Sequence, residues 1–301
     1  MSLTKTQLKE RLGMITGSNA GTILGVNPYS SKYCMWATKT GLIVDDFKGN
    51  NKTDLGTALE DFCVKKYITT TGNKVRQVKR TLRHKKHKYI GGHIDGAIQG
   101  DKNRGLECKV VTPDGMAKWF ADDGGLVVPA YYQAQVLHYA LMTGRMIWDF
   151  SVVFTDGRRD PAILTIEFSK ADLDDYLDKC IQFWKLVESN TPPSIDDSAA
   201  TAEALKKQWQ TTDPGSIKVA TPEVMRHLKM RQAHKDKRDV YDAQVQLAVN
   251  RYMNYMEDAE TLISPSGTIL ATSKPDKNNK RRNAFKPITE ELTDGNYATA
   301  V

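Results

Sequence analysis

Three segments of strand character follow one another between residues 74 and 111, and this run constrains the fold more than any other feature of the chain. The segments cover residues 74–82, 88–98 and 105–111, and turn residues such as Gly100 and Asp101 separate the last two. Predicted helices and two further strands surround the run. The predicted order is therefore helices, three strands, a helix, two strands and a helix, which indicates a mixed α/β domain around one central sheet.

The flanking elements follow from apolar spacing and from capping residues. Leu55, Leu59, Phe62, Cys63 and Tyr67 form a helical stripe in residues 55–72. The other predicted elements are a helix over residues 4–12, a helix capped by Ser18 and Asn19 that ends at Gly25, a helix at 32–41, a helix at 129–144, strands at 146–157 and 161–168, and a helix at 170–189 capped by Ser169.

The C-terminal third has a different character. We place a domain boundary in the segment "NTPPSIDDS", with one domain over residues 1–195 and a helical, basic accessory region over residues 196–301. A helical stripe is predicted there, with apolar residues alternating four and three apart; it comprises Tyr241, Val245, Ala248, Tyr252, Tyr255, Ala259 and Leu262. Such a stripe could pack within the chain, on a second copy of the chain, or on a partner protein. A terminal hairpin is predicted over residues 265–276.

Composition narrows the class of protein. The net charge of +7 suits a polyanionic partner, and basic clusters lie at residues 78–88 and 274–286, where solvated loops are the alternative interpretation. No apolar run approaches the roughly 20 residues of a membrane span. The four cysteines are far apart, which argues against a zinc or a clustered iron–sulfur site and indicates reduced thiols in a cytosol.

Charged residues interrupt two of the predicted strands. Asp95 lies in the second strand of the run, and Glu107 and Lys109 share one face of the third, because side chains alternate across a strand. A salt-bridge ladder on an exposed sheet would explain this pattern. The alternative is a site for a hard cation such as Mg²⁺, which binds one or two carboxylates, water and phosphate.

The neighbouring helices carry polar residues in a suitable order. Glu60 belongs to the segment "GTALE", and Gln133, Gln135 and Tyr139 belong to "YYQAQVLHY". The order GxxxE, D, ExK, QxxxY resembles the PD-(D/E)xK nuclease superfamily, and within it the phage lambda exonuclease type, or YqaJ-like viral recombinases. The resemblance covers about residues 8–190, and Ile94 replaces the leading proline of the motif.

The resemblance implies a restriction-endonuclease-like core and a role for each residue. Asp95, Glu107 and the backbone carbonyl of Cys108 would bind Mg²⁺, for which Mn²⁺ is the substitute ion, and Lys109 would position the attacking water. Glu60 would support the metal site. Gln135 would be the helix glutamine, with Gln133 as the competing candidate. Arg11 and Ser18 would bind the 5′-phosphate of a DNA end.

The resemblance also implies an activity and partners. The expected activity is 5′ to 3′ digestion of linear double-stranded DNA from its ends, which leaves 3′ single strands. A homotrimer and a single-strand annealing protein as partner are expected from the same resemblance. A PD-(D/E)xK endonuclease is an alternative, which a circular plasmid would distinguish. A DNA-binding or annealing module without activity is the other alternative, although Asp95, Glu107 and Lys109 are all present.

Overall fold

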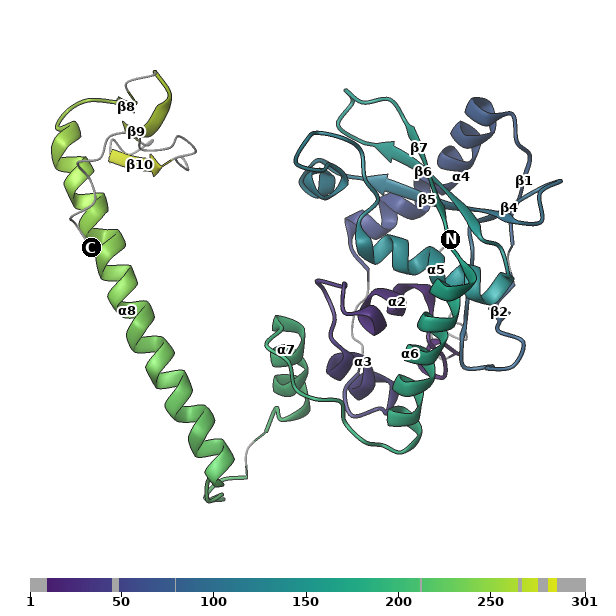
Figure 1. Ribbon diagram of the computed structural model, residues 1–301, viewed down its shortest axis with the longest axis horizontal. Helices are drawn as coiled ribbons and strands as arrows, with labels where there is room; N and C mark the ends of the chain where they lie inside the picture. The colour runs from purple at the N-terminus through teal and green to yellow at the C-terminus, as the bar shows by residue number, and fades with distance from the viewer. Residues whose placement is uncertain are drawn as a thin grey trace. The chain divides into compact units, whose positions relative to one another are not determined.

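The chain forms two compact units, Met1–Thr212 and Asp213–Val301. The computed structural model, shown in Figure 1, describes residues 10–44, 49–78, 80–211, 213–264, 267–275 and 281–285. The sequence places the boundary after residue 195, before α7 (Ala199–Gln208). In the structure α7 belongs to the first unit, because the Tyr33 hydroxyl donates to Gln208 Oε1 at 2.6 Å and Ala204 is buried in the core.

A five-stranded mixed sheet forms the centre of the first unit. Its order is β1-β4-β5-β6-β7. The strands are β1 (Val75–Arg76), β4 (Gly96–Ile98), β5 (Arg104–Val111), β6 (Ile147–Phe154) and β7 (Ala162–Glu167). β5 and β6 are parallel, and the other neighbours are antiparallel. Parallel neighbours need a crossover, which α5 (Ala130–Thr143) provides. The predicted mixed α/β class is confirmed.

The first two predicted strands are each divided into two short strands. Residues 74–82 give β1 and the start of β2 (Leu82–Arg83), and residues 88–98 give β3 (Gly91–Gly92) and β4. β2 pairs with β3, whereas β1 pairs with β4 in the main sheet. In residues 88–98 the break falls at Asp95, which occupies a bend immediately before β4. Because of this bend, the candidate metal ligand Asp95 takes no part in regular strand pairing.

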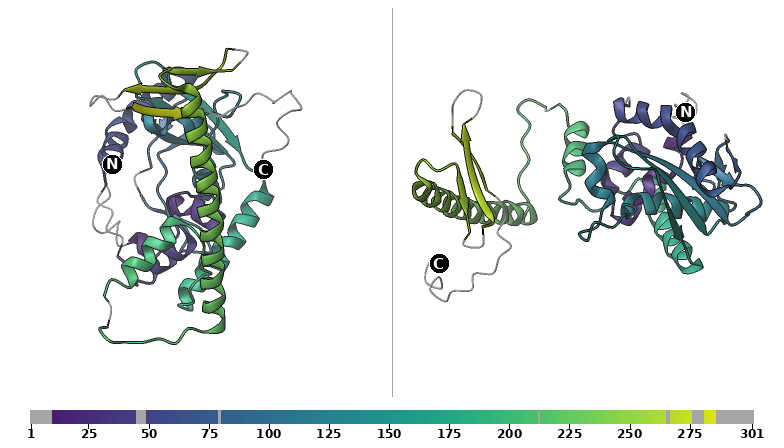
Figure 2. Two further views of the ribbon diagram at one scale, coloured as in Figure 1. Left: turned by 90° about the vertical axis from the view of Figure 1, so that its left-hand side faces the viewer. Right: turned by 90° about the horizontal axis from the view of Figure 1, so that it is seen from above.

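Helices cover both faces of the sheet, as Figures 1 and 2 show. α4 (Asn51–Thr71) packs on one face, where Val64 and Tyr67 form a small core with Ile98 and Leu106. α5 packs on the other face, and α2 (Gly17–Leu24), α3 (Lys32–Lys39) and α6 (Lys170–Glu188) extend this larger core. The sheet thus separates two packing layers.

Capping residues in the sequence correctly predict most helix ends, but the starts of two helices differ from the prediction. Thr16, and not Ser18 or Asn19, caps α2, since the Thr16 N–H donates to Asn19 Oδ1 at 3.0 Å. α4 begins at Asn51 under the Asn50 cap, earlier than predicted. Ser169 caps α6 as predicted, and α5 ends at Gly144. Of the predicted helix over 4–12, residues 10–12 are described and are helical.

Burial along α4 differs in part from the predicted stripe. Cys63 and Tyr67 are buried as expected, but Phe62 is 41% exposed and Val64 is buried in its place. A 3-10 helix, η1 (Pro113–Trp119), follows β5 and was not predicted.

The second unit contains a long helix and a small sheet. Helix α8 (Pro222–Met256) precedes β8 (Thr261–Ile263), β9 (Ile269–Pro275) and β10 (Arg281–Phe285), which form an antiparallel sheet. The predicted stripe runs too far, because Ala259 and Leu262 lie beyond the end of α8. Its residues Tyr241 and Val245 are exposed. Residues 276–280 and 286 of the basic cluster lie outside the described residues.

The helices that the structure describes include none with the length and apolar character needed to cross a membrane.

Candidate active site

Strand β5 presents a buried ion pair to helix α5. Glu107 is 2% exposed, and Lys109 Nζ lies 2.6 Å from Glu107 Oε1. The two residues share a face of the strand because they are two positions apart. Burial of a carboxylate is costly unless it is paired and hydrogen-bonded. Glu107 and Lys109 therefore form a buried ion pair and not a salt-bridge ladder on an exposed sheet face.

Gln135 of α5 completes the pair. Its Oε1 accepts from Lys109 Nζ at 3.0 Å, and its Nε2 donates to Glu107 Oε1 at 2.7 Å and to the Tyr139 hydroxyl at 2.7 Å. An ammonium only donates and a carboxylate only accepts, so the amide fits in one orientation. Gln133 instead donates to the carbonyl of Val128 at 2.7 Å, outside this network. The structure thus places Gln135, and not Gln133, at the site.

Tyr132 is a member of the site that was not singled out from the sequence. Lys109 Nζ lies 4.3 Å from the centroid of the Tyr132 ring, which is a cation–π contact. Tyr132, Gln135 and Tyr139 follow one another at spacings of three and four, so they lie on one face of α5. This spacing relative to Gln135 is the sequence signal that points to Tyr132. Burial lowers the pKa of Lys109, but the charge of Glu107 and the Tyr132 hydroxyl outweigh it, so its pKa is raised overall.

Asp95 approaches the same strand from the bend before β4. Its Oδ2 accepts from the Cys108 N–H at 2.8 Å. Burial, and then the charge of Glu107, raise the pKa of Asp95 well above its usual value. The charge of Glu60 on α4 acts in the same direction, so α4 brings this carboxylate close as well. Three carboxylates predicted from the sequence therefore lie near one another.

The donor atoms suit a hard divalent cation. Glu107 Oε2 is buried and accepts no hydrogen bond from the described residues. The Cys108 N–H points toward Asp95, and in an extended strand the carbonyl of the same residue points to the same side. No group of three His, Cys, Asp or Glu side chains with metal-site geometry occurs in the described part of the chain. A cation here would rest on two carboxylates and one carbonyl, as Mg²⁺ does when water and phosphate complete its shell.

Arg11 and Ser18 form a second group beside the carboxylates. Arg11 Nη2 donates to Ser18 Oγ at 2.8 Å, although seven positions separate the two residues. Burial raises the pKa of Tyr139 and lowers that of His93, and the charge of Arg11 lowers both. Arg11 is therefore close to Tyr139 and His93. The structure thus brings Arg11 and Ser18, for which the resemblance implies binding of a 5′-phosphate, next to the Gln135 network.

Gly17 permits this close approach of α2 to α5. A Cβ atom at Gly17 would lie 2.5 Å from Cε1 of Tyr139, which is far inside van der Waals contact. Tyr139 itself is buried and its ring cannot retreat freely. The absence of a side chain at Gly17 thus sets the distance between the Arg11–Ser18 pair and the carboxylates.

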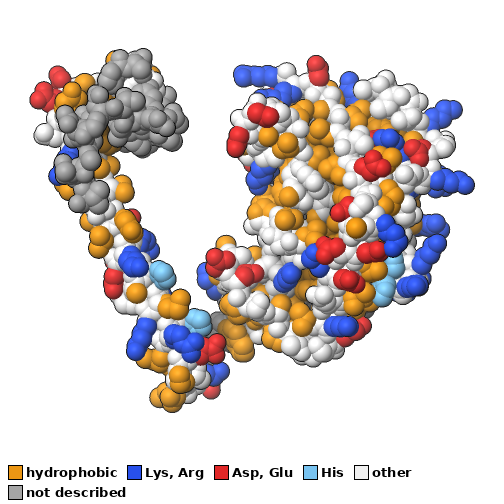
Figure 3. All heavy atoms as spheres, in the orientation of Figure 1, with side chains coloured by type: hydrophobic (Ala, Val, Ile, Leu, Met, Phe, Trp, Pro, Cys, Tyr) orange, Lys and Arg blue, Asp and Glu red, His pale blue; other side chains and the backbone are white. Residues whose placement is uncertain are grey.

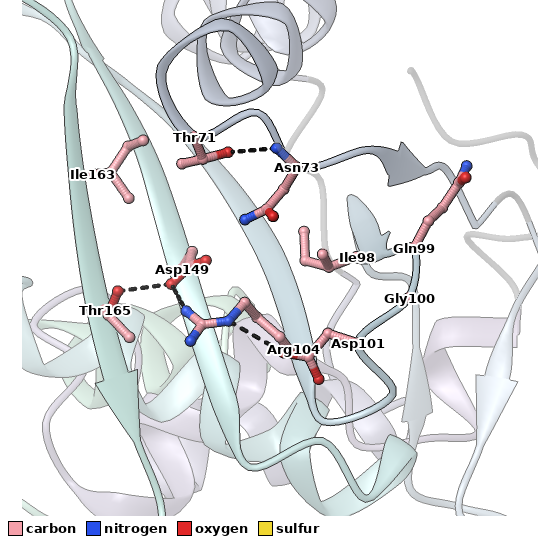
Figure 4. Close-up of a pocket in the computed structure, with 10 residues that line it drawn as sticks. All are labelled: Thr71, Asn73, Ile98, Gln99, Gly100, Asp101, Arg104, Asp149, Ile163 and Thr165. Carbon is pink, nitrogen blue, oxygen red and sulfur yellow. Dashed lines mark hydrogen bonds and ion pairs between the residues drawn. The ribbon is translucent and has the colours of Figure 1, made fainter.

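A polar pocket of about 510 Å³ lies near the start of β5 (Figure 4). At its centre Asp149 Oδ1 accepts from Arg104 Nη1 and from Thr165 Oγ1, each at 2.7 Å. Its Oδ2 accepts from the Tyr67 hydroxyl at 2.6 Å. Both carboxylate oxygens of Asp149 are satisfied within the protein, so this cluster joins β5, β6, β7 and α4 and serves the fold.

Comparison with known proteins identifies the domain. Residues 7–146 match the model of the YqaJ-like viral recombinase domain. This part of the chain is similar to YqaJ-like viral recombinase domains. The resemblance read from the sequence is confirmed, and the matched residues include every site residue predicted from it.

Relatives extend the likeness beyond the YqaJ-like domain. The uncharacterized protein YqaJ of Bacillus subtilis (strain 168) is 27% identical over 262 residues, which cover 84% of this chain and 78% of the relative. The alkaline exonuclease LHK-Exo from Laribacter hongkongensis has a TM-score of 0.52 at 21% identity, over 62% of this chain and 94% of its own. Its complex with dAMP gives 0.53 at 21% identity, over 68% and 97%. These structures show that much of this chain shares the fold of that exonuclease.

Proposed function

We propose that this protein is a metal-dependent deoxyribonuclease that digests linear duplex DNA from its 5′ ends and leaves 3′ single strands for annealing. The observation that carries the proposal is the buried network of Glu107, Lys109 and Gln135 beside Asp95. The fold shared with an alkaline exonuclease supports it. One of the similar structures is a complex of that exonuclease with dAMP, which supports a nucleotide substrate for this protein.

The residues divide the chemistry among them. Asp95, Glu107 and the Cys108 carbonyl would hold Mg²⁺, or Mn²⁺ in its place, and the bound ion would supply Lewis-acid stabilisation of charge on the phosphate. Lys109 has a raised pKa, so its ammonium acts as a hydrogen-bond donor that orients the attacking water and not as a base. Gln135 holds Lys109 and Glu107 in register. Glu60 supports the carboxylate group from α4.

Hydrolysis at this site breaks the bond between phosphorus and O3′. Water adds to phosphorus, the released nucleotide keeps a 3′-hydroxyl, and the remaining strand keeps a new 5′-phosphate. Arg11 and Ser18 would bind that phosphate, because a guanidinium and a hydroxyl donate well to an anion. The product of one cleavage is thus the substrate end for the next.

The cellular location, oligomeric state and partner are proposed from the same family resemblance. We infer action in the cytoplasm of a bacterial host, as a homo-oligomer, with a trimer as the expected form, and together with a single-strand annealing protein. The accessory region is the candidate for contacts with that partner. Size determination in solution tests the trimer directly.

The decisive experiment uses linear and circular duplex DNA with Mg²⁺, with each strand labelled at one end. The proposal requires loss of nucleotides from 5′ ends of the linear DNA, an intact circle, and no reaction in EDTA. Glu107→Gln is the matched inactive control, because it keeps the size of the side chain and removes the charge. Cutting of the circle would instead support the endonuclease, and binding without hydrolysis would support an inactive module.

A further inference from the structure

A second cavity of about 600 Å³ lies on the first unit, on the side of β1 and β2. Four of its lining residues are arginines: Arg76, Arg80, Arg83 and Arg145. No carboxylate lines it in the described part of the chain. Figure 3 shows Lys and Arg side chains projecting along the right-hand edge of this unit, where β1 and β2 lie in Figure 1. The cavity is therefore a concentrated positive site.

Carboxylates of the described residues leave most of the charge of these arginines uncompensated. None of the four forms an ion pair with a carboxylate among the residues that the structure describes. Arg145 Nη1 donates to the carbonyls of Asp101 and Arg104, at 3.0 and 2.8 Å, and Arg83 Nη1 donates to the carbonyl of Lys88 at 2.8 Å. Burial, and then the charge of Arg76, lower the pKa of Arg145, and Asp101 offsets this only in part. Like charges held together in this way favour an anionic ligand.

The floor of the cavity is apolar, which narrows the ligand further. Ile94 is 4% exposed, Ala97 is 3% exposed and Met142 is 8% exposed, and Val78 and Leu82 are partly buried beside them. The phosphates on the outside of a duplex bring no apolar surface to such a floor, because the bases are stacked inside. An unpaired nucleotide presents the faces of its base as well as its phosphates, and bases stack on apolar and guanidinium surfaces irrespective of sequence.

The cavity adjoins the candidate active site through two elements. Ile94 and Ala97 flank Asp95 in the chain, and Met142 and Thr143 follow Tyr139 on α5. Thr143 Oγ1 donates to the carbonyl of Tyr139 at 2.7 Å. One helical turn, about 5.4 Å along the axis, separates the two positions. A strand that occupies the active site can thus continue into the cavity.

We propose that this cavity is a binding site for single-stranded DNA, in which arginines contact the phosphates and the apolar floor contacts a base. The inference rests on the proposed function, because it assigns a further segment of the strand that occupies the active site. It goes beyond that function because the site needs neither metal nor hydrolysis to bind its ligand.

The test measures binding of a fluorescent single-stranded oligonucleotide to the full chain in EDTA, where no hydrolysis occurs. Arg76→Gln/Arg80→Gln removes two arginines whose side chains form no hydrogen bond or ion pair among the described residues. Arg158→Gln/Lys185→Gln removes the same charge from exposed positions of the same unit that do not line the cavity. The cavity variant is expected to raise Kd at least tenfold over this control. The slope of log K against log salt should fall by roughly 1.4, because each phosphate contact to a single strand contributes about 0.7.

Two results would overturn the assignment. Equal affinity of the cavity variant and the control variant would show that the arginines do not bind DNA. Equal wild-type affinity for an abasic strand of the same length would show that the apolar floor contacts no base, which leaves a general polyanion site. Arg76→Lys/Arg80→Lys, which retains the charge, guards against misfolding and should recover part of the affinity. Since the assay contains no metal, its outcome is independent of whether the protein hydrolyses DNA.

Discussion

His138 makes the stability of the first unit depend on pH in a way that can be calculated. Its imidazole is 0% exposed and lies on α5, between Gly91 of β3 and Tyr176 of α6. A carbonyl only accepts, so Nε2 carries the proton and donates to the Gly91 carbonyl at 3.0 Å, while Nδ1 accepts from the Tyr176 hydroxyl at 2.9 Å. Both nitrogens are satisfied in the neutral form, and a second proton would place a positive charge on a fully buried side chain.

Burial lowers the pKa of His138 from its ordinary value of 6.5 to about 4. Because the pKa in the folded state lies below that in the unfolded state, the unfolded chain takes up the proton first as the pH falls. The stability that neutral His138 contributes is complete above about pH 6.5 and is lost toward pH 4. At pH 5 the loss is about 2 kcal/mol, since each pKa unit corresponds to about 1.4 kcal/mol.

The measurement is urea unfolding followed by tryptophan fluorescence between pH 5 and pH 7.5. All five tryptophans lie before residue 212, so the signal reports on the first unit. His138→Gln can still accept from Tyr176 and donate to Gly91, but it does not titrate. Relative to this variant, the wild type should lose about 2 kcal/mol more between pH 7.5 and pH 5. Parallel pH profiles for the two proteins would refute the assignment of a neutral, buried imidazole.

Three further perturbations test the site and its support. Glu107→Gln should abolish hydrolysis of linear duplex DNA while DNA binding in a gel-shift assay persists, because phosphate contacts elsewhere supply the affinity; retained hydrolysis would exclude Glu107 from the chemistry. Arg11→Ala should remove a preference for 5′-phosphorylated over 5′-hydroxyl ends, worth about ten- to a hundred-fold for one charged hydrogen bond, and equal initial rates of the wild type on the two ends would contradict the phosphate site. Asp149→Ala should destabilise the first unit by about 3 kcal/mol in urea unfolding, because it leaves Arg104 and the Tyr67 hydroxyl without their buried partner, and a change below 1 kcal/mol would show that water replaces it.

The charged residues of β5 could be read from the sequence because strand alternation fixes which side chains share a face. Glu107 and Lys109 needed no tertiary information, and the order of elements then predicted the mixed sheet. The choice between Gln133 and Gln135 could not be made in this way, because two positions turn a helix by about 200°. Deciding it requires knowledge of which face of α5 meets the sheet. Tyr132 shares a helix face with Gln135, so its spacing identifies it only after Gln135 has been chosen.

Other differences arise where long-range contacts override local signals. Ser18 is a good capping residue, yet the Thr16 backbone is held beside β3 through the Ile15 N–H, which donates to the Tyr89 carbonyl at 2.6 Å. This contact fixes where α2 begins. α7 belongs to the first unit through Tyr33 and Gln208, which are 175 positions apart. A contact of that span leaves no trace in local composition.

The contact between Gly17 and Tyr139 has a consequence for how such chains can vary. No other residue fits at position 17 while a tyrosine ring lies against it, and the same tyrosine holds Gln135 by its hydroxyl. A smaller side chain at position 139 would leave room for a side chain at position 17. Gln135 would then lose its hydrogen bond to the Tyr139 hydroxyl. The two positions are therefore expected to change together among related sequences or not at all, and a substitution at one should be tolerated only with a compensating substitution at the other.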